Sequence, residues 1–131
     1  MRDPAQLKFS REHEWLSVEG DVGTIGITDF AQNELGDIVY VELPQQDARI
    51  SAGGEMGTIE SVKSVSELFS PVSGQVVEVN AELGNAPELV NREPYGRGWM
   101  VKVRLSDPKE VESLLGLDAY QAYVKGGSQS Q

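Results

Sequence analysis

The feature that most constrains the fold is a lone lysine, Lys63, between two segments of high β propensity. Met56–Ser61 and Gln75–Asn80 are rich in β-branched and apolar residues, whereas the segment between them is mostly small and polar. This arrangement predicts a tight hairpin with Lys63 at its tip. Single apolar residues are expected to anchor its legs in a core: Ile59, Val62, Val65 and Leu68. The serines beside the lysine leave it open to solvent: Ser61, Ser64 and Ser66. An ordinary solvated turn lysine would fit the same pattern.

A weak internal repeat surrounds this hairpin. Gly36–Glu42 and Gly74–Asn80 share the pattern glycine, any residue, β-branched residue, valine, any residue, valine, polar residue. Related halves on either side of Lys63 predict a quasi-symmetric β-sandwich with its axis near the lysine. Short strands share such patterns by chance, so a coincidence remains the alternative.

Further strands and one short helix are predicted from local patterns. The strands are Trp15–Val18, Val22–Ile27, Ile38–Leu43 and Trp99–Leu105. The first two form a hairpin through the turn at residues 19–21. Thr28 or Asp29 caps a short helix, Gln32 completes the capping pair, and Gly36 ends it.

The C-terminal region is predicted to be helical. Asp107 caps a helix that starts at Pro108, has Glu110 in its capping box and ends at Gly116. A second short helix starts at Asp118 and stops near Gly126. Three segments are expected to lack regular structure: 1–6, 45–51 and 81–93. Residues 127–131 have nothing to bury and are expected to form a disordered tail, which leaves 1–126 as a single domain.

Composition limits the classes of partner. The chain has 131 residues, which suits one compact domain, and we expect a monomer. Eleven basic residues against 21 acidic ones give a formal net charge of −10. This charge argues against nucleic-acid binding and favours proteins with basic docking faces. Without cysteine the chain has no disulfide, thiol nucleophile or thiolate metal site.

The sequence also bears on location. Residues 1–6 lack the apolar core of a secretion signal, and no apolar run approaches membrane-spanning length. We therefore expect a soluble, cytoplasmic protein that does not enter a membrane. A mature mitochondrial chain without its transit peptide would look the same.

His13 is the only histidine, which excludes a multi-histidine metal site. A small hydrolase would pair His13 with Ser70 or Ser73, with Glu14 to orient the imidazole. Ser73 precedes Gly74 in what is predicted to be a β-turn, and this setting does not resemble a nucleophile elbow. We prefer His13 as a surface residue beside a half-buried Trp15.

Several motifs together resemble one known family. Around the lysine they are Glu60-Ser61-Val62-Lys63, Ser70-Pro71-Val72-Ser73-Gly74 and the following Val76, Glu78, Val79 and Asn80. Elsewhere they are His13-Glu14-Trp15-Leu16, residues 26–32 and 35–44, Pro94-Tyr95-Gly96 and Gly98-Trp99-Met100. The chain is similar in these stretches to the H protein of the glycine cleavage system, a lipoyl carrier. Ser64 departs mildly from the alanine expected in that family.

The resemblance implies a mainly β fold of the lipoyl and biotinyl carrier type, a β-sandwich (barrel-sandwich hybrid) with short peripheral and C-terminal helices. It implies covalent lipoic acid on Lys63 and a carrier rather than an enzyme. The lipoyl group would take the aminomethyl group of glycine from a pyridoxal-phosphate glycine decarboxylase to a tetrahydrofolate-dependent aminomethyltransferase. A flavin-containing dihydrolipoamide dehydrogenase would then reoxidise it, and lipoyl-attachment enzymes would load it.

The resemblance also implies a cleft that receives the loaded arm. The acidic candidates for this cleft are Glu12, Glu14 and Glu67. Carboxylates there could hold the cationic aminomethyl group through charge-assisted hydrogen bonds. The alternative is that all three are solvated surface acids.

Three other functions remain open. An H-like carrier could relay lipoate to other enzymes. A biotin carrier is disfavoured because Val62 and Ser64, not methionines, flank Lys63. The third is the small hydrolase that uses His13.

Overall fold

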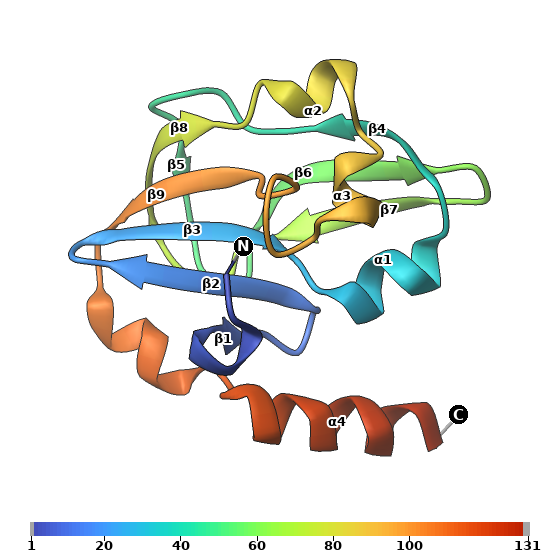
Figure 1. Cartoon of the computed structure of the whole chain (residues 1–131). Helices are drawn as coiled ribbons and strands as arrows, with labels where there is room; N and C mark the ends of the chain where they lie inside the picture. The colour runs from blue at the N-terminus through green and yellow to red at the C-terminus, as the bar shows by residue number, and fades with distance from the viewer. Residues whose placement is uncertain (1, 130–131) are drawn as a thin grey trace.

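The computed structural model describes residues 2–129 as two antiparallel sheets with short helices around them (Figure 1). The larger sheet has six strands in the order β1-β2-β3-β9-β8-β5. Their bounds are β1 Lys8–Phe9, β2 Glu14–Glu19, β3 Val22–Ile27, β5 Arg49–Ile50, β8 Gly74–Val79 and β9 Val101–Leu105. The smaller sheet has the order β4-β6-β7, with β4 Ile38–Glu42, β6 Glu55–Ser61 and β7 Val65–Phe69.

The main core lies between the sheets. Ile25, Val76 and Val103 come from the larger sheet, and Ile59 and Leu68 come from the smaller one; all five are buried in one cluster. The mainly β sandwich that the sequence patterns and the family resemblance predicted is confirmed as the fold class. The β2–β3 hairpin and β4, β6 and β8 match their predicted ranges within two residues.

Helix α1, Asp29–Leu35, is confirmed with its caps. The Thr28 side chain accepts a hydrogen bond from the Ala31 N–H, and Gly36 ends the helix at a φ of 85°. The predicted capping partner Gln32 instead donates to the Asp29 side chain at 2.8 Å. The helix therefore begins and ends where the capping rules place it.

The hairpin prediction was wrong about two side chains. Ile59 and Leu68 are buried, but Val62 is 68% exposed and Val65 is 65% exposed. Both lie at or beside the tip, which projects beyond the sandwich and has no opposing sheet to cover it (Figure 1). They cannot anchor the hairpin.

The predicted helix from Pro108 to Gly116 is instead a 3-10 helix, η2, over Pro108–Ser113. Asp107 accepts from the Lys109 N–H, but the Glu110 carboxylate accepts from Ser73 N at 2.7 Å and Ser73 Oγ at 2.9 Å. Because Glu110 bonds to a distant turn, it does not complete a capping box. The chain then leaves the helix to pair Leu115 with Phe9.

Several short elements lie in segments predicted to lack structure. They are η1 Pro4–Gln6, β5, α2 Glu82–Asn85 and α3 Leu89–Arg92. The last helix, α4, spans Leu117–Gln129 and so continues past the predicted stop near Gly126. Residues 130–131 of the predicted tail lie outside the described residues, and the division at residue 126 remains a prediction. No helix within 2–129 is long and apolar enough to cross a membrane.

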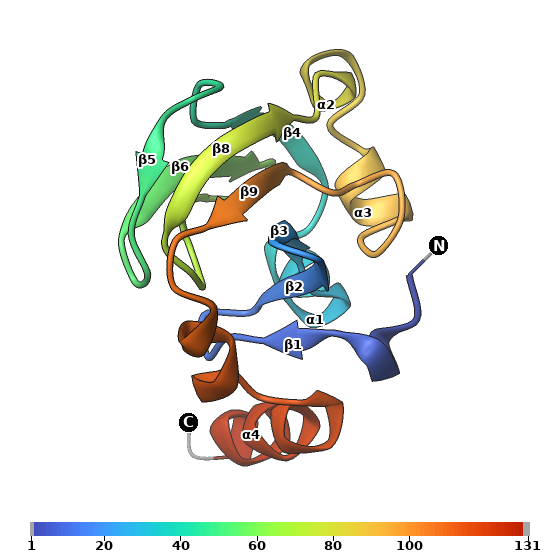
Figure 2. The ribbon, with the colours of Figure 1, turned by 90° about the vertical axis from the view of Figure 1, so that its left-hand side faces the viewer.

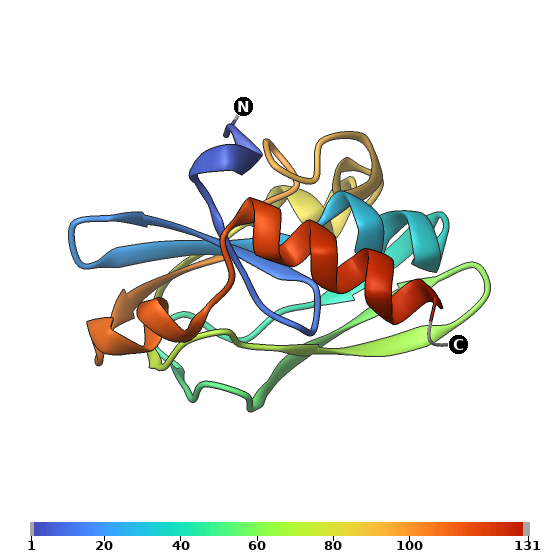
Figure 3. The ribbon, with the colours of Figure 1, turned by 90° about the horizontal axis from the view of Figure 1, so that it is seen from below.

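Helix α4 packs against the N-terminal strand rather than against the main core (Figure 2). Phe9 and Tyr120 stack with ring centroids 4.7 Å apart, and Leu7 and Trp15 complete a second buried cluster. Trp15 is fully buried, not half-buried as predicted, and donates from Nε1 to Pro94 O at 2.9 Å. Seen from below, α4 runs toward the side that carries α1 and the β6–β7 hairpin (Figure 3).

Candidate functional site: the Lys63 hairpin and its cleft

The hairpin tip is fixed by the hydroxyl and backbone of Ser61. Ser61 N–H donates to Ser64 O at 2.8 Å, which closes the turn. Ser61 Oγ accepts from Lys63 N at 3.3 Å and from Ser64 N at 3.1 Å. The turn therefore has internal partners for its backbone, and the exposed Lys63 side chain stands on a defined base.

A second support comes from the segment that joins α1 to β4. Val62 N–H donates to Asp37 O at 3.0 Å. A Cβ placed on Gly36 would lie 3.4 Å from Lys63 Cε, so the lysine stem passes over a residue without a side chain. Gly36 thus has two roles here: it adopts the left-handed conformation that ends α1, and it leaves room for the lysine.

Asn91 holds this segment in place, and the sequence reasoning missed it. Its amide donates to Gln32 Oε1 at 2.8 Å and to Gly36 O at 2.9 Å. Its oxygen accepts from Ile38 N at 2.8 Å. The sequence predicts only that Asn91 lies in a loop, because a single asparagine gives no indication of a hydrogen-bond partner 53 residues away.

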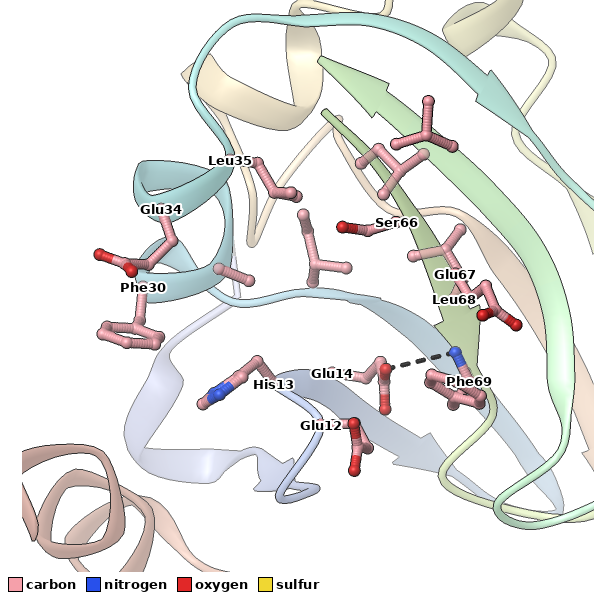
Figure 4. A pocket seen from close by; sticks show the side chains of 14 residues that line it. Glu12, His13, Glu14, Phe30, Glu34, Leu35, Ser66, Glu67, Leu68 and Phe69 are labelled. Atoms are coloured by element: carbon pink, nitrogen blue, oxygen red, sulfur yellow. Dashed lines mark hydrogen bonds between the residues drawn. The ribbon is translucent and has the colours of Figure 1, made fainter. Parts of the chain in front are cut away.

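A cleft of about 700 Å³ adjoins the hairpin, between β7, α1 and the turn before β2 (Figure 4). Its apolar wall includes Ile27, Ala31, Leu35, Ile59, Val65 and Leu68. The structure brings all three acidic candidates, Glu12, Glu14 and Glu67, to this one cleft. Lys63 is not part of the lining, but two residues that line the cleft are its neighbours in the chain or next to Gly36: Val65 lies two residues after Lys63, and Leu35 directly precedes Gly36.

Glu14 is 3% exposed, so it is not the solvated surface acid of the alternative interpretation. Its carboxylate accepts from Ser10 Oγ at 2.6 Å and from Phe69 N at 3.4 Å (Figure 4). Burial raises the pKa of Glu14 to about 7, although these hydrogen bonds oppose the shift. A buried carboxyl with this pKa gains from a nearby cation, because the cation stabilises its charged form.

Glu12 and Glu67 are exposed at the edge of the cleft. A hydrogen bond with Glu67, together with its negative charge, raises the pKa of Glu55 on the neighbouring strand. The cleft therefore combines an apolar wall with acidic groups.

His13 belongs to the support of the cleft. Its backbone is left-handed, with a φ of 71°, and its Nδ1 is hydrogen-bonded to Tyr120 Oη at 2.8 Å. Tyr120 Oη is also hydrogen-bonded to Thr28 Oγ1 at 2.8 Å, so α4 joins the turn before β2 to the start of α1. Burial lowers the pKa of His13, which favours the neutral imidazole.

The geometry does not assemble a serine nucleophile around His13. Glu14 bonds to Ser10 rather than to the imidazole. Ser70 Oγ donates to Val72 O, and Ser73 Oγ donates to Glu110. Within residues 2–129, neither proposed serine is hydrogen-bonded to His13.

Comparison with known proteins identifies the family. The family model described as "Glycine cleavage H-protein" matches residues 7–127. The glycine cleavage system H proteins of Staphylococcus epidermidis and Symbiobacterium thermophilum are each 52% identical to the chain over 124 residues. These alignments cover 95% of this chain and 98% and 97% of the two relatives.

A crystal structure of a glycine cleavage system H protein from Mycobacterium marinum superposes with a TM-score of 0.84 at 36% identity. The match covers 92% of this chain and 97% of that one. It confirms the expected lipoyl-carrier type of β-sandwich. The chain therefore belongs to the glycine cleavage H-protein family.

Proposed function

We propose that Lys63 is the attachment residue through which this chain acts as the lipoyl carrier of the glycine cleavage system. The observation that carries the proposal is an exposed lysine on a hydrogen-bonded turn, next to an open cleft. Family membership supports a carrier rather than a catalyst. The carrier needs an amine that an attachment enzyme can reach and a surface on which the arm can rest.

The residues of the cleft suit a lipoyl arm. A volume of about 700 Å³ lies in the usual range for small-molecule sites. The apolar wall suits a hydrocarbon stem, and the acidic residues suit a cationic end group. The bound lipoyl group would supply a dithiolane whose S–S bond opens on loading, so that one sulfur would carry the aminomethyl group and the other would become a thiol.

Within the cleft, Glu14 would act on the cargo electrostatically. Its ionised carboxylate would accept a hydrogen bond from the ammonium of the cargo, while Ser10 and the Phe69 N–H hold the carboxylate in position. Glu12 and Glu67 would add negative potential at the entrance. The cleft walls would keep water away from the cargo during transfer between enzymes.

The partners we propose are the pyridoxal-phosphate glycine decarboxylase, the aminomethyltransferase, dihydrolipoamide dehydrogenase and a lipoyl-attachment enzyme. A net charge of −10 would steer the carrier toward basic docking faces and away from its own copies.

The mass of the chain from its native source tests the attachment residue. Amide formation between Lys63 Nζ and the carboxyl carbon of lipoic acid, with loss of water, adds about 188 Da. Tryptic mapping should place this gain on Lys63. An unmodified Lys63 from cells that lipoylate other proteins would refute the proposal. Glycine decarboxylation with purified partner enzymes then separates glycine cleavage from lipoate relay.

A second experiment tests the acidic cleft. Glu14→Gln keeps the size of the side chain but removes its charge, so the loaded carrier should release ammonia and formaldehyde faster. Glu88→Gln, an exposed acid outside the cleft, is the matched control. Equal release rates in all three proteins would remove Glu14 from the proposal.

A further inference from the structure

The hydroxyl of Tyr120 connects helix α4 to the cleft without lining it. The Tyr120 ring is buried against Phe9, and its Oη lies 2.8 Å from both His13 Nδ1 and Thr28 Oγ1. Tyr120 itself is not among the residues that line the cleft. Its side chain therefore stands behind the cleft and acts on it through His13 and Thr28.

The two bonded side chains belong to two different walls of the cleft. His13 lies in the turn before β2 and lines one wall, whereas Thr28 is the N-cap of α1, which forms the other (Figure 4). Where the walls meet, the rings of His13 and Phe30 have centroids 4.8 Å apart. The backbone also joins the walls, because Thr28 N–H donates to His13 O at 3.0 Å. A single hydrogen bond acts as a hinge, so the hydroxyl of Tyr120 supplies a second fixed point between the walls.

Helix α1 depends on such bonds for its position. It spans seven residues, none of them fully buried, so apolar packing supplies only part of its restraint. Asn91 binds the segment after its C-terminal end. At its N-terminal end Tyr120 is bonded to Thr28, and the Tyr95 hydroxyl accepts from Asp29 N at 3.0 Å. The bond to Tyr95 is exposed to solvent, whereas the bond to Tyr120 is buried and so is the stronger restraint.

The hydrogen bonds around Tyr120 have one direction that satisfies every group. Thr28 Oγ1 already accepts from Ala31 N at 3.2 Å, which leaves its own proton for Tyr120 Oη. Tyr120 then donates to His13 Nδ1. This assignment requires a neutral imidazole with its proton on Nε2, and burial, which lowers the pKa of His13, favours the same neutral form.

Protonation of His13 would reverse this direction. Nδ1 would become a donor to Tyr120, and Tyr120 would have to donate to Thr28, which is buried and would then need another acceptor for its own proton. The hydroxyl of Tyr120 therefore favours the neutral imidazole. The other titratable or charged groups around this pair are Arg11, Glu12, Glu14, Glu34, Tyr95 and Tyr123.

We propose that Tyr120 is a positioning residue for the arm cleft, because its hydroxyl holds α1 against the turn before β2 in the arrangement that shields a loaded arm. Tyr120 touches neither the arm nor the cargo and acts through His13 and Thr28. Loss of the hydroxyl would let the N-terminal end of α1 move, and water would reach the cargo where the two walls meet. This inference rests on the proposed function, because it assumes that a loaded arm rests in the cleft.

The first test uses the unmodified chain. His13 is the only histidine, so its imidazole gives a single set of nuclear magnetic resonance signals. Wild type should show the Nε2-protonated tautomer. Tyr120→Phe should raise the pKa of His13 and speed hydrogen exchange of the Ala31 amide relative to amides of β8 and β9. Tyr123→Phe is the matched control and should change neither, because it removes a hydroxyl of the same helix that bonds to Arg11 O.

The second test uses the carrier loaded at Lys63 with lipoate and then with the aminomethyl group. Tyr120→Phe should release ammonia and formaldehyde roughly fivefold faster than wild type, the factor expected for loss of one hydrogen bond. Tyr123→Phe should keep the wild-type rate. Val103→Ala weakens the core outside the cleft lining, so it separates loss of stability from loss of position and should also keep the wild-type rate. All rates are measured at a temperature at which every variant is folded.

The outcomes separate the two proposals. A chain that a lipoate–protein ligase does not acylate on Lys63 would overturn the proposed function, and this inference with it. A loaded carrier that releases its cargo equally fast with and without the Tyr120 hydroxyl would overturn only the positioning role. An unchanged pKa of His13 in Tyr120→Phe would do the same, as would release from Val103→Ala as fast as from Tyr120→Phe.

Discussion

At the scale of single residues, Glu14 combines burial with a proposed function for its charge. An acid that is 3% exposed loses hydration, and two hydrogen bonds replace only part of it. The fold therefore holds a carboxyl that ionises near neutral pH, in the cleft where a cationic cargo would rest. The same carboxyl group that is costly to bury is therefore the one proposed to bind the cargo.

The burial of the Glu14 carboxyl group predicts how the stability of the fold depends on pH. With a folded pKa of about 7 and an ordinary value of 4.5, Glu14 holds a proton in the folded state that the unfolded chain releases between these pH values. The free energy of unfolding should therefore fall as pH rises through this window. Glu14→Gln should remove about 2 kcal/mol of the decrease between roughly pH 5.5 and 8.5. Urea unfolding measures this, and Glu88→Gln, which changes an exposed acid outside the cleft, should leave the wild-type slope unchanged.

Elements fix the geometry around Lys63 through a few polar side chains. The hairpin tip depends on Ser61, the segment beneath it depends on Asn91, and the cleft walls are joined by Tyr120. Each bond joins segments whose own secondary structure does not determine their relative position. Local sequence therefore forms each element, whereas side chains from distant segments of the chain set the relative positions of the elements.

The turn predicts a local effect of Ser61→Ala. The change removes the acceptor for Lys63 N and Ser64 N, and it should cost about 1 kcal/mol. Hydrogen exchange of these two amides should accelerate more than exchange in β8 or β9. Ser64→Ala is the control, because Ser64 contributes backbone groups to the turn. Equal exchange in both variants would contradict a role for the Ser61 hydroxyl.

The contacts of Tyr120 in helix α4 predict a second effect on stability. Tyr120→Phe keeps the stack on Phe9 but removes the hydroxyl shared by His13 and Thr28. Because Thr28 is buried, the loss should be roughly 1 to 2 kcal/mol in chemical unfolding. Tyr123→Phe removes only an exposed bond to Arg11 O and should cost less. The same loss for both tyrosines would show that the shared hydroxyl has no special importance.

At the scale of the whole molecule, negative charge is the dominant electrostatic feature. The ion pairs within residues 2–129 join largely exposed side chains, Arg97 to Glu82, Lys102 to Glu78 and Arg104 to Asp21. Such pairs contribute little to stability, so they do not offset the repulsion from a net charge of −10.

Salt should therefore stabilise the folded chain. Raising sodium chloride from about 0.02 M to about 0.2 M shortens the screening length to under roughly 10 Å and weakens the repulsion. We expect a rise of a few degrees in Tm by calorimetry, together with slower association with a basic partner in stopped-flow mixing. A Tm that stays constant or falls would mean that local ion pairs outweigh the net charge.

The sequence by itself determined the elements with strong local signals. The turn at residues 19–21, the cap at Thr28, the stop at Gly36 and the hairpin around Lys63 depend on neighbours in the chain. It also determined that the Lys63 side chain is exposed to solvent, because the serines near the lysine are small and polar. The family resemblance then brought Glu12, Glu14 and Glu67 together as candidates.

Only the tertiary structure decided which side chains are buried and what they contact. Val62 and Val65 are apolar yet exposed, because no second sheet reaches the tip, whereas Glu14 is ionisable yet buried, with its carboxyl group bonded to the Phe69 N–H of β7. Glu110 satisfied the local capping pattern, but its carboxylate bonds to Ser73, and η2 is a 3-10 helix. Asn91 gained its role from bonds to α1 and β4. Local patterns set backbone preferences of about 1 kcal/mol, and contacts between distant segments outweigh them wherever burial or a polar partner is at stake.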